Sequence, residues 1–547
     1  MFSISKRPTI TEIHDLYRTN RATVAQVVQF FLNRSAEIDK KLNGFDHLTE
    51  TLALQQAESA DLVLEGLTKQ KTKDGVILFD FENLITRQPL FGIPYAIKAI
   101  IQAENEVFNA SSKVLDNFHS PYSSTVYNKV QAVGAILLGV ANMDQFAMGA
   151  SGESSNIGPA YNPFDPSRVP GGSSSGSCVV VASGQVVFSL GTDTGGSIRQ
   201  PAAFCDLVGL KPTYGLVSRW GVIPMASSLD QVGGIANTVE DSLIVNKVLA
   251  GQDPKDQTTL DSRELNIKLE SLITKRHQSR QVKKITKSLK PIRIGLPKEF
   301  FVDGIDPIIA KAMSDLIKKL GGLGHTIIET SIPTIDQAIA VYYLTMSVEV
   351  AANLERIDGI RYAAQQDKYK DLFFEHRGQY LGDEVKRRII LGTYASSSGY
   401  YDAYYNQAQK VRELTRRDFE RAFQDCDLLL TPTTPEFPFP IGSKTSDPLT
   451  MYLSDIFTAG INPVRLPAMN VPLGLFDVPV IDSKQKQDST QSLENVSDAV
   501  ENDQSVSHSD TATTVRLPTG CQIIGPELSE DLIYELAFEI ENLVKKT

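Results

Sequence analysis

Residues 170–199 read PGGSSSGSCVVVASGQVVFSLGTDTGGSIR, and this stretch decides the fold. Two loops rich in glycine and serine, 170–177 and 191–199, enclose two short apolar runs, Val179–Ala182 and Val186–Leu190. Apolar runs of this length, bounded by turn residues, are typical of buried helix turns or strands. Because helix and strand patterns alternate on both sides of the stretch, we predict a layered α/β fold.

The rest of the chain continues this alternation. Apolar residues recur at helical spacing over 9–60, 123–132, 305–320, 336–357, 400–424 and 528–545. Short apolar runs next to turn residues predict strands at 91–101, 135–139 and 291–296. Proline, glycine and serine make 163–177 a loop.

Composition and charge exclude several classes of protein. The 547 residues are 41% hydrophobic and 22% charged, typical of a globular protein with one large core or two to three domains. The net charge of −11 argues against a surface that binds nucleic acid throughout. The four cysteines are scattered, so we expect reduced thiols rather than disulfides or a zinc site. No apolar stretch reaches 18 residues and no signal peptide is recognisable, which predicts a cytoplasmic protein without a membrane span.

Two polar segments interrupt the pattern. Residues 252–290 end in a basic run, 275–290, which we interpret as a solvated loop, with a local basic binding patch as the alternative. Residues 482–514 contain no aromatic residue and are dominated by polar and charged ones. Such a segment buries too little apolar area to offset its ordering entropy, so we predict a disordered surface insertion.

Ser197 follows two glycines in a loop that suits a nucleophile. Glycine lets the backbone turn tightly and approach a substrate, and successive peptide N–H groups can then point into one small volume. The candidate oxyanion donors are the N–H groups of Thr194, Gly195, Gly196 and Ser197. A plain glycine-rich turn is the alternative interpretation of this loop.

Lys98 is the candidate base for that nucleophile. A serine hydroxyl needs a proton acceptor, and none of the seven histidines lies in either loop. Strand alternation places Ala96, Lys98 and Ile100 on one face of an apolar strand. Burial lowers a lysine pKa from about 10.4 by up to about 3–5 units, which leaves a neutral amine. The alternatives are a surface lysine on an edge strand and a lysine paired with a buried carboxylate.

Three segments together resemble the motifs of the amidase signature family: Gly92–Lys98, Gly171–Ser177 and Asp193–Arg199. The resemblance implies a layered α/β/α fold, in which helices cover a central mixed β-sheet. It also implies that Ser197 is the nucleophile, Ser173 the proton relay and Lys98 the base. Asp193 and Arg199 either pair to hold the loop or are ordinary structural charges.

Two positions depart from the family pattern. Ala99 and Ile100 replace the usual Asp-Asn after the lysine, which makes the surroundings of Lys98 more apolar and favours a lowered pKa. Ser175 replaces a glycine, so we expect a small local difference in the loop.

The resemblance extends over a single amidase domain, 1–547. Its expected parts are an N-terminal helical region 1–75, the signature core 76–251, the polar and basic insertion 252–290, a C-terminal half of the core with substrate-recognition helices 291–481, the disordered insertion 482–514, and a closing strand and helix 515–547.

Later segments are similar to the A subunits of tRNA-dependent amidotransferases. They are Asn142–Gly149, Gln200–Cys205, Ser227–Gln231, Glu384–Arg388, Gly399–Tyr405 and Asp447–Tyr452. This similarity implies hydrolysis of the glutamine side-chain amide, with the ammonia used to convert Glu-tRNA(Gln), Asp-tRNA(Asn) or both. It also implies that Arg388 binds the α-carboxylate, Asp455 the α-ammonium group, and Tyr342 the same substrate. A structural role in a helix is the alternative for each.

The same similarity implies partners. Ammonia would pass to a B subunit that binds ATP, Mg²⁺ and most of the misacylated tRNA, and a small C subunit would complete a heterotrimer. No cofactor and no metal are expected in this chain, which has no P-loop motif for ATP.

Three other functions stay open. A stand-alone amidase of small carboxamides would share the catalytic loops. A scaffold that has lost its active site conflicts with the intact Lys98, Ser173 and Ser197. A phosphate-binding module would need a loop lysine that both Gly/Ser loops lack.

Overall fold

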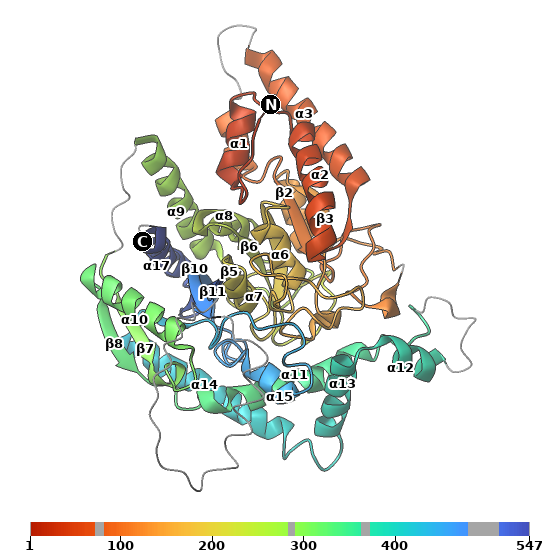
Figure 1. The fold of residues 1–547 in the computed structure, drawn as a ribbon, viewed down its shortest axis with the longest axis vertical. Helices are drawn as coiled ribbons and strands as arrows, with labels where there is room; N and C mark the ends of the chain where they lie inside the picture. The colour runs from red at the N-terminus through yellow and green to blue at the C-terminus, as the bar shows by residue number, and fades with distance from the viewer. Residues whose placement is uncertain are drawn as a thin grey trace, which may run out of the picture.

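The computed structural model describes residues 2–71, 81–116, 118–282, 290–362, 372–479 and 514–545. Within these ranges eleven strands form one mixed sheet in the order β1-β3-β2-β4-β6-β5-β10-β11-β9-β7-β8 (Figure 1). The strands are β1 (Phe45–Leu48), β2 (Pro94–Lys98), β3 (Ile136–Ala141), β4 (Phe188–Asp193), β5 (Val208–Lys211), β6 (Gln231–Ala236), β7 (Arg293–Pro297), β8 (Thr326–Thr330), β9 (Leu428–Pro432), β10 (Ala468–Pro479) and β11 (Thr514–Ile524).

The centre of one half of the sheet is built from parallel strands. β2 lies between β3 and β4 and runs parallel to both. All three strands are buried throughout, which explains why their sequences are apolar runs rather than alternating patterns. Because parallel strands end at the same edge of a sheet, Lys98 at the end of β2 lies beside Asp193 at the end of β4.

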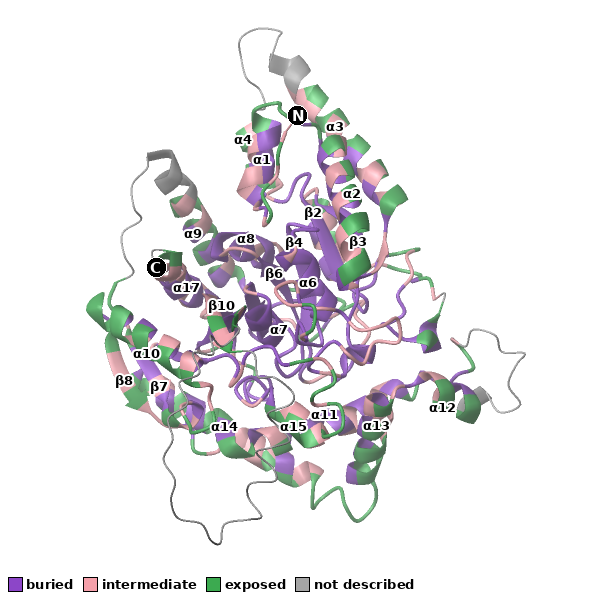
Figure 2. Ribbon diagram, viewed as in Figure 1, coloured by how far each residue is buried: buried purple, intermediate pink, exposed green. Residues whose placement is uncertain are grey.

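Helices pack around the sheet, and buried residues concentrate on β2, β3, β4, β5, β6 and β9 and on α6, α7 and α8 (Figure 2). The helices are α1 (Ile10–Arg18), α2 (Val24–Leu42), α3 (Glu50–Lys71), α4 (Phe81–Arg87), α5 (Thr125–Ala132), α6 (Ser175–Ala182), α7 (Arg199–Phe204), α8 (Val239–Leu249), α9 (Arg263–Val282), α10 (Pro307–Gly322), α11 (Ala338–Leu354), α12 (Arg377–Tyr380), α13 (Asp383–Ser396), α14 (Tyr405–Asp425), α15 (Pro448–Leu453) and α17 (Glu530–Lys545). None of the described helices is both long and apolar enough to cross a lipid bilayer.

The second half of the sheet joins the first through long antiparallel pairing. β10 pairs with β5 on one side and with β11 on the other, and β11 then pairs with β9. β9, β7 and β8 are mutually parallel. α11 packs against both α13 and α14, and α13 projects away from the sheet (Figure 1).

The predicted α/β class and most predicted elements are confirmed, with four corrections. The predicted loop 163–177 ends earlier than expected, because α6 begins at Ser175. Residues 9–60 are not helical throughout, because Asn43 adopts a left-handed conformation (φ +49°) that ends α2 before β1. The strand over 91–101 ends at Lys98, so Ile100 does not share a strand face with it. The segment 275–290 is not a loop up to residue 282, because α9 continues to Val282.

Other predictions fall outside the described residues. These are the remainder of the basic run, 283–289, and the insertion 482–514 except for Thr514, which already belongs to β11.

Candidate active site

Lys98 sits at the centre of a ring of hydroxyl groups. Its Nζ lies 2.8 Å from Ser173 Oγ, 2.9 Å from Ser174 Oγ and 2.9 Å from Thr192 Oγ1. Ser173 and Ser174 come from the loop that leads into α6, and Thr192 comes from the end of β4. The end of β2 therefore meets both Gly/Ser loops at one point.

The environment of Lys98 favours a neutral amine. The side chain is fully buried on an inner strand, which rules out the surface lysine on an edge strand. Within the described residues no carboxylate forms an ion pair with Nζ. Burial lowers the pKa of Lys98 to about 7, although the more distant Asp144, Asp193 and Asp230 oppose that shift. Lys98 is therefore able to accept a proton near neutral pH.

The two candidate serines lie on adjacent loops. The Ser174 N–H donates to the Ser197 carbonyl oxygen at 3.1 Å, which ties the relay loop to the nucleophile loop. The peptide bond between Gly172 and Ser173 is cis. Ser173 is fully buried and Ser197 is 8% exposed, as expected for a relay behind a nucleophile. The contact between Lys98 and Ser173 is present, but in this conformation no hydrogen bond joins the Ser173 and Ser197 side chains, both of which the structure describes.

Close packing against the nucleophile loop requires its two glycines. Gly196 has φ +139°, and a Cβ there would lie 2.2 Å from Thr458 Oγ1. A Cβ at Gly195 would lie 2.4 Å from Tyr342 Cζ. The loop is therefore more than a plain turn, because the 455–462 segment and α11 close directly onto it.

Asp193 and Arg199 pair, and the pair anchors the loop. Arg199 Nε and Nη2 each donate to one Asp193 oxygen at 2.9 Å, and both side chains are fully buried. Arg199 Nη1 reaches Gln522 Oε1 at 2.7 Å, and Nη2 reaches Asn462 Oδ1 at 2.6 Å. The Arg199 guanidinium holds the pKa of the Asp193 carboxyl below its usual value despite burial. The loop is thus fixed to β11 and to the 455–462 segment.

The structure narrows the candidate oxyanion donors. The Gly196 N–H donates to Asp193 Oδ1 at 2.9 Å, so it turns away from a substrate in this conformation. The candidates that remain are the N–H groups of Thr194, Gly195 and Ser197. The side chain of Thr194 fixes its position, because its hydroxyl donates a hydrogen bond to the buried Asp230 carboxylate at 2.8 Å.

Thr194→Val is expected to lower the rate of amide hydrolysis about 10- to 100-fold. Without its hydroxyl, residue 194 loses the bond to Asp230 that orients its N–H, and misplaced oxyanion donors are costly. Thr194→Ser keeps the hydroxyl and should stay within about threefold of the parent. The measurement is kcat for ammonia release, and equal rates for the Val and Ser variants would contradict this role.

Asp455 and Tyr342 lie where a substrate would meet the loop. Asp455 Oδ1 is buried and accepts no hydrogen bond from the described residues, and a Cβ at Gly196 would lie 3.4 Å from it. Burial raises the pKa of Asp455 to about 8, and Arg388 opposes the shift. A buried carboxyl without a partner suits a cationic ligand group. The roles of Asp455 and Tyr342 as substrate contacts stay predictions.

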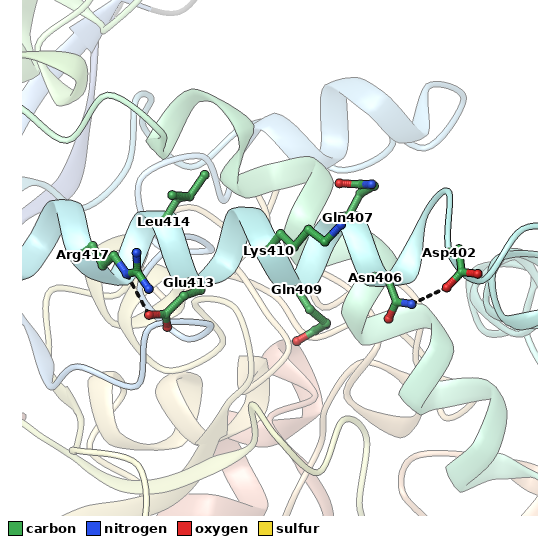
Figure 3. A pocket seen from close by; sticks show the side chains of 8 residues that line it. All are labelled: Asp402, Asn406, Gln407, Gln409, Lys410, Glu413, Leu414 and Arg417. Carbon is green, nitrogen blue, oxygen red and sulfur yellow. Dashed lines mark hydrogen bonds and ion pairs between the residues drawn. The ribbon is translucent and has the colours of Figure 1, made fainter.

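Arg388 lines a cavity of about 300 Å³, to whose lining neither Asp455 nor Tyr342 belongs. Asp144, whose carboxylate lies against the relay loop, lines the same cavity. A larger hollow of about 690 Å³ lies along α14, and none of Lys98, Ser173 and Ser197 belongs to its lining (Figure 3). Its walls are side chains of Asp402, Asn406, Gln407, Gln409, Lys410, Glu413, Leu414 and Arg417. The smaller cavity is the better candidate for a substrate pocket, because Arg388 and Asp144 line it, although Ser173 and Ser197 do not belong to its lining.

The rate of amide hydrolysis is expected to rise with pH. With a pKa of about 7, roughly a tenth of Lys98 is neutral at pH 6 and about nine-tenths at pH 8. Because only the neutral amine accepts the Ser173 proton, kcat at saturating substrate should increase about tenfold over this range. A kcat profile that is flat or falling between pH 6 and pH 8 would exclude Lys98 as the base.

Some contacts of the site could not be found by reading motifs. Ser174 belongs to a recognised loop, but its position beside Lys98 carried no signal of its own. Thr458, whose hydroxyl donates to the Gly195 carbonyl at 2.9 Å, lies in a segment without motif spacing. Asn462 and Gln522 also lie in segments without motif spacing.

Comparisons with known proteins agree with this geometry. The family described as Amidase matches residues 26–534. The A subunit of the glutamyl-tRNA(Gln) amidotransferase of Sulfurihydrogenibium sp. (strain YO3AOP1) is 40% identical over 540 residues, covering 98% of this chain and 97% of that protein. The protein of the same name from Geobacillus thermodenitrificans (strain NG80-2) is 40% identical over 536 residues, covering 97% and 96%.

Solved structures show the same fold. The A subunit of the glutamyl-tRNA(Gln) amidotransferase of Thermotoga maritima superposes with a TM-score of 0.68 at 30% identity, covering 98% of this chain and 95% of that one. A bacterial aryl acylamidase of the amidase signature family superposes with a TM-score of 0.74 at 19% identity, covering 98% and 96%. The chain belongs to the amidase family.

Proposed function

We propose that this chain is the glutaminase subunit of a tRNA-dependent amidotransferase. The observation that carries the proposal is the 2.8 Å contact between a buried Lys98 amine and Ser173, on a loop bonded to that of Ser197. Similarity to amidotransferase A subunits over nearly the whole chain selects glutamine among possible amides. The ammonia released serves to convert Glu-tRNA(Gln), Asp-tRNA(Asn) or both into the amidated forms.

The reaction proceeds through an acyl-enzyme. Ser197 Oγ attacks the side-chain carbonyl carbon while its proton passes to Ser173 and the Ser173 proton passes to Lys98 Nζ. The N–H groups of the nucleophile loop stabilise the oxyanion. The proton then returns through Ser173 to the leaving nitrogen, and ammonia departs. Water repeats the sequence on the ester, releasing glutamate and free Ser197.

Three residues hold the rest of glutamine in this proposal. Arg388 binds the α-carboxylate, for which a planar guanidinium provides two parallel donors. Asp455 binds the α-ammonium group, which restores the ionised form of its carboxyl. Tyr342 packs against the substrate next to Gly195.

In this proposal the chain works as one subunit of a complex. A B subunit holds ATP and Mg²⁺ and binds most of the misacylated tRNA, a small C subunit completes the heterotrimer, and the assembly works in the cytoplasm. In this proposal the chemistry on this chain requires no cofactor or metal. Its net charge of −11 is consistent with tRNA binding on the partner.

Co-purification and an ammonia assay test the proposal. The full chain, expressed with candidate B and C subunits, should form a stable complex that consumes glutamine and amidates mischarged tRNA. The alternative is a stand-alone amidase of small carboxamides, which would form no complex and would hydrolyse simple aliphatic or aryl amides as fast as glutamine. That outcome would replace the proposed function.

A further inference from the structure

Glu384 connects the two segments that carry the proposed charge contacts. It precedes Arg388 by one turn on α13 and accepts a hydrogen bond from Arg388 Nε at 2.7 Å. The same carboxylate oxygen accepts a hydrogen bond from the Tyr452 hydroxyl of α15 at 3.0 Å. The other oxygen pairs with Arg387, whose side chain is 44% exposed. Only 17% of the Glu384 side chain is exposed.

Two aromatic rings complete the support of Arg388. Tyr343 and Tyr452 stack with ring centroids 3.9 Å apart and planes 25° apart. The Arg388 guanidinium carbon lies 5.5 Å from the Tyr343 ring centre and 6.0 Å from that of Tyr452, within the range of a cation–π interaction. The guanidinium is thus held at its Nε side and along the two rings.

The far edge of the guanidinium is left open. Nη1 contacts only the weak acceptor Met346 Sδ, at 3.8 Å, and no oxygen of the described residues accepts a hydrogen bond from Nη1 or Nη2. These two nitrogens form the fork that binds a carboxylate bidentately. Glu384, Arg388, Tyr343 and Tyr452 all line the 300 Å³ cavity, so Arg388 borders space for a ligand.

The Tyr452 contact also sets the position of Asp455. The Asp455 N–H donates to the Tyr452 carbonyl oxygen at 3.2 Å, so the residue that bonds Glu384 through its hydroxyl holds Asp455 through its backbone. Glu384 therefore fixes both the orientation of the Arg388 guanidinium and the position of the segment that carries Asp455.

We propose that Glu384 is a positioning residue that makes the pocket specific for amides bearing an α-amino acid group. It acts through Arg388 and Tyr452 and touches no reacting atom. This inference rests on the proposed function, because it names the substrate group that the same site selects.

Glutamine binding by variants of the full chain tests the inference. In a Ser197→Ala background, which prevents turnover, calorimetric titration gives the Kd for L-glutamine. Glu384→Ala should raise this Kd about 10- to 100-fold, since hydrogen bonds to charged groups that orient the guanidinium are lost. Tyr452→Phe, which keeps the ring and loses only the hydroxyl, should raise it about 3- to 10-fold. Lys386→Ala, which removes a cation from the same helix outside the lining of the cavity, is the matched control and should change the Kd less than twofold.

A second readout separates positioning from a general structural effect. The probe is butanamide, which is glutamine without its α-ammonium and α-carboxylate groups. In the chain with Ser197 intact, Glu384→Ala should lower kcat/KM for L-glutamine at least about tenfold and that for butanamide less than twofold. Equal losses on both substrates, or an effect of Lys386→Ala as large as that of Glu384→Ala, would overturn the positioning role.

These measurements distinguish failure of the proposed function from failure of the positioning role of Glu384. If the Ser197→Ala parent binds no glutamine, the proposed function fails and this inference fails with it. If the parent binds glutamine and Glu384→Ala and Tyr452→Phe bind it equally well, the positioning role alone is wrong. Should Glu384→Ala fail to fold, the Tyr452→Phe result decides.

Discussion

Ser197→Ala is expected to lower glutamine hydrolysis about 10⁴- to 10⁶-fold, the range that follows removal of a serine nucleophile in other hydrolases. Without Oγ no acyl-enzyme forms, and the remaining oxyanion donors accelerate only the direct attack of water. The fold should persist, because the Ser197 hydroxyl forms no hydrogen bond with the described residues. The measurement is initial-rate ammonia release at saturating glutamine, with circular dichroism to confirm the fold.

Ser175→Ala is the matched control for this experiment. Ser175 belongs to the neighbouring Gly/Ser loop, and its buried hydroxyl has no hydrogen-bond partner among the described residues. Its removal should leave the rate within about threefold. A Ser197→Ala chain that retained a tenth or more of the parental activity would show that another residue is the nucleophile.

Lys98→Met is expected to reduce the same rate by at least about 10³-fold. Methionine fills the volume of the aliphatic part of the lysine side chain but offers no proton acceptor, so no group accepts the Ser173 proton. Lys98→Arg should be equally inactive, because a guanidinium keeps the positive charge and the donors but is never neutral in a protein. The two variants together therefore test whether Lys98 acts as a proton acceptor and not only as a positive charge.

The result that would contradict this role is an active Lys98→Arg chain. Activity there would mean that a permanent cation suffices and that the proton leaves by another route. Both variants are measured at pH 8, where most of the parental Lys98 is expected to be neutral.

The strands and loops around the reacting atoms could be predicted from the sequence because their signals are local. An apolar run interrupted by one lysine predicts a buried amine, and Lys98 is fully buried. Glycine pairs before a serine predict close approach of other groups, and Tyr342 and Thr458 approach Gly195 and Gly196. These inferences depend on neighbours within a few residues of the chain.

Features that depend on distant partners could not be predicted. The four residues of β1 form a strand only because β3 offers an edge for pairing. Arg199 reaches Asn462 and Gln522, which lie 263 and 323 positions further along the chain. No local pattern distinguishes an asparagine or glutamine that will meet a buried guanidinium from one that will face solvent. The same holds for the hydroxyl ring that surrounds Lys98.

The position of β11 has a consequence for synthesis on the ribosome. β9, β7 and β8 are connected to the other strands of the sheet only through β11, which begins at Thr514 near the end of the chain. Gln522 on that strand also completes the shell of Arg199 behind the nucleophile. A nascent chain without β11 therefore has the catalytic serines and lysine but an unfinished scaffold. We expect amide cleavage to begin only after residues 514–524 have been synthesised, so that chains without β11 do not consume free amino-acid amide.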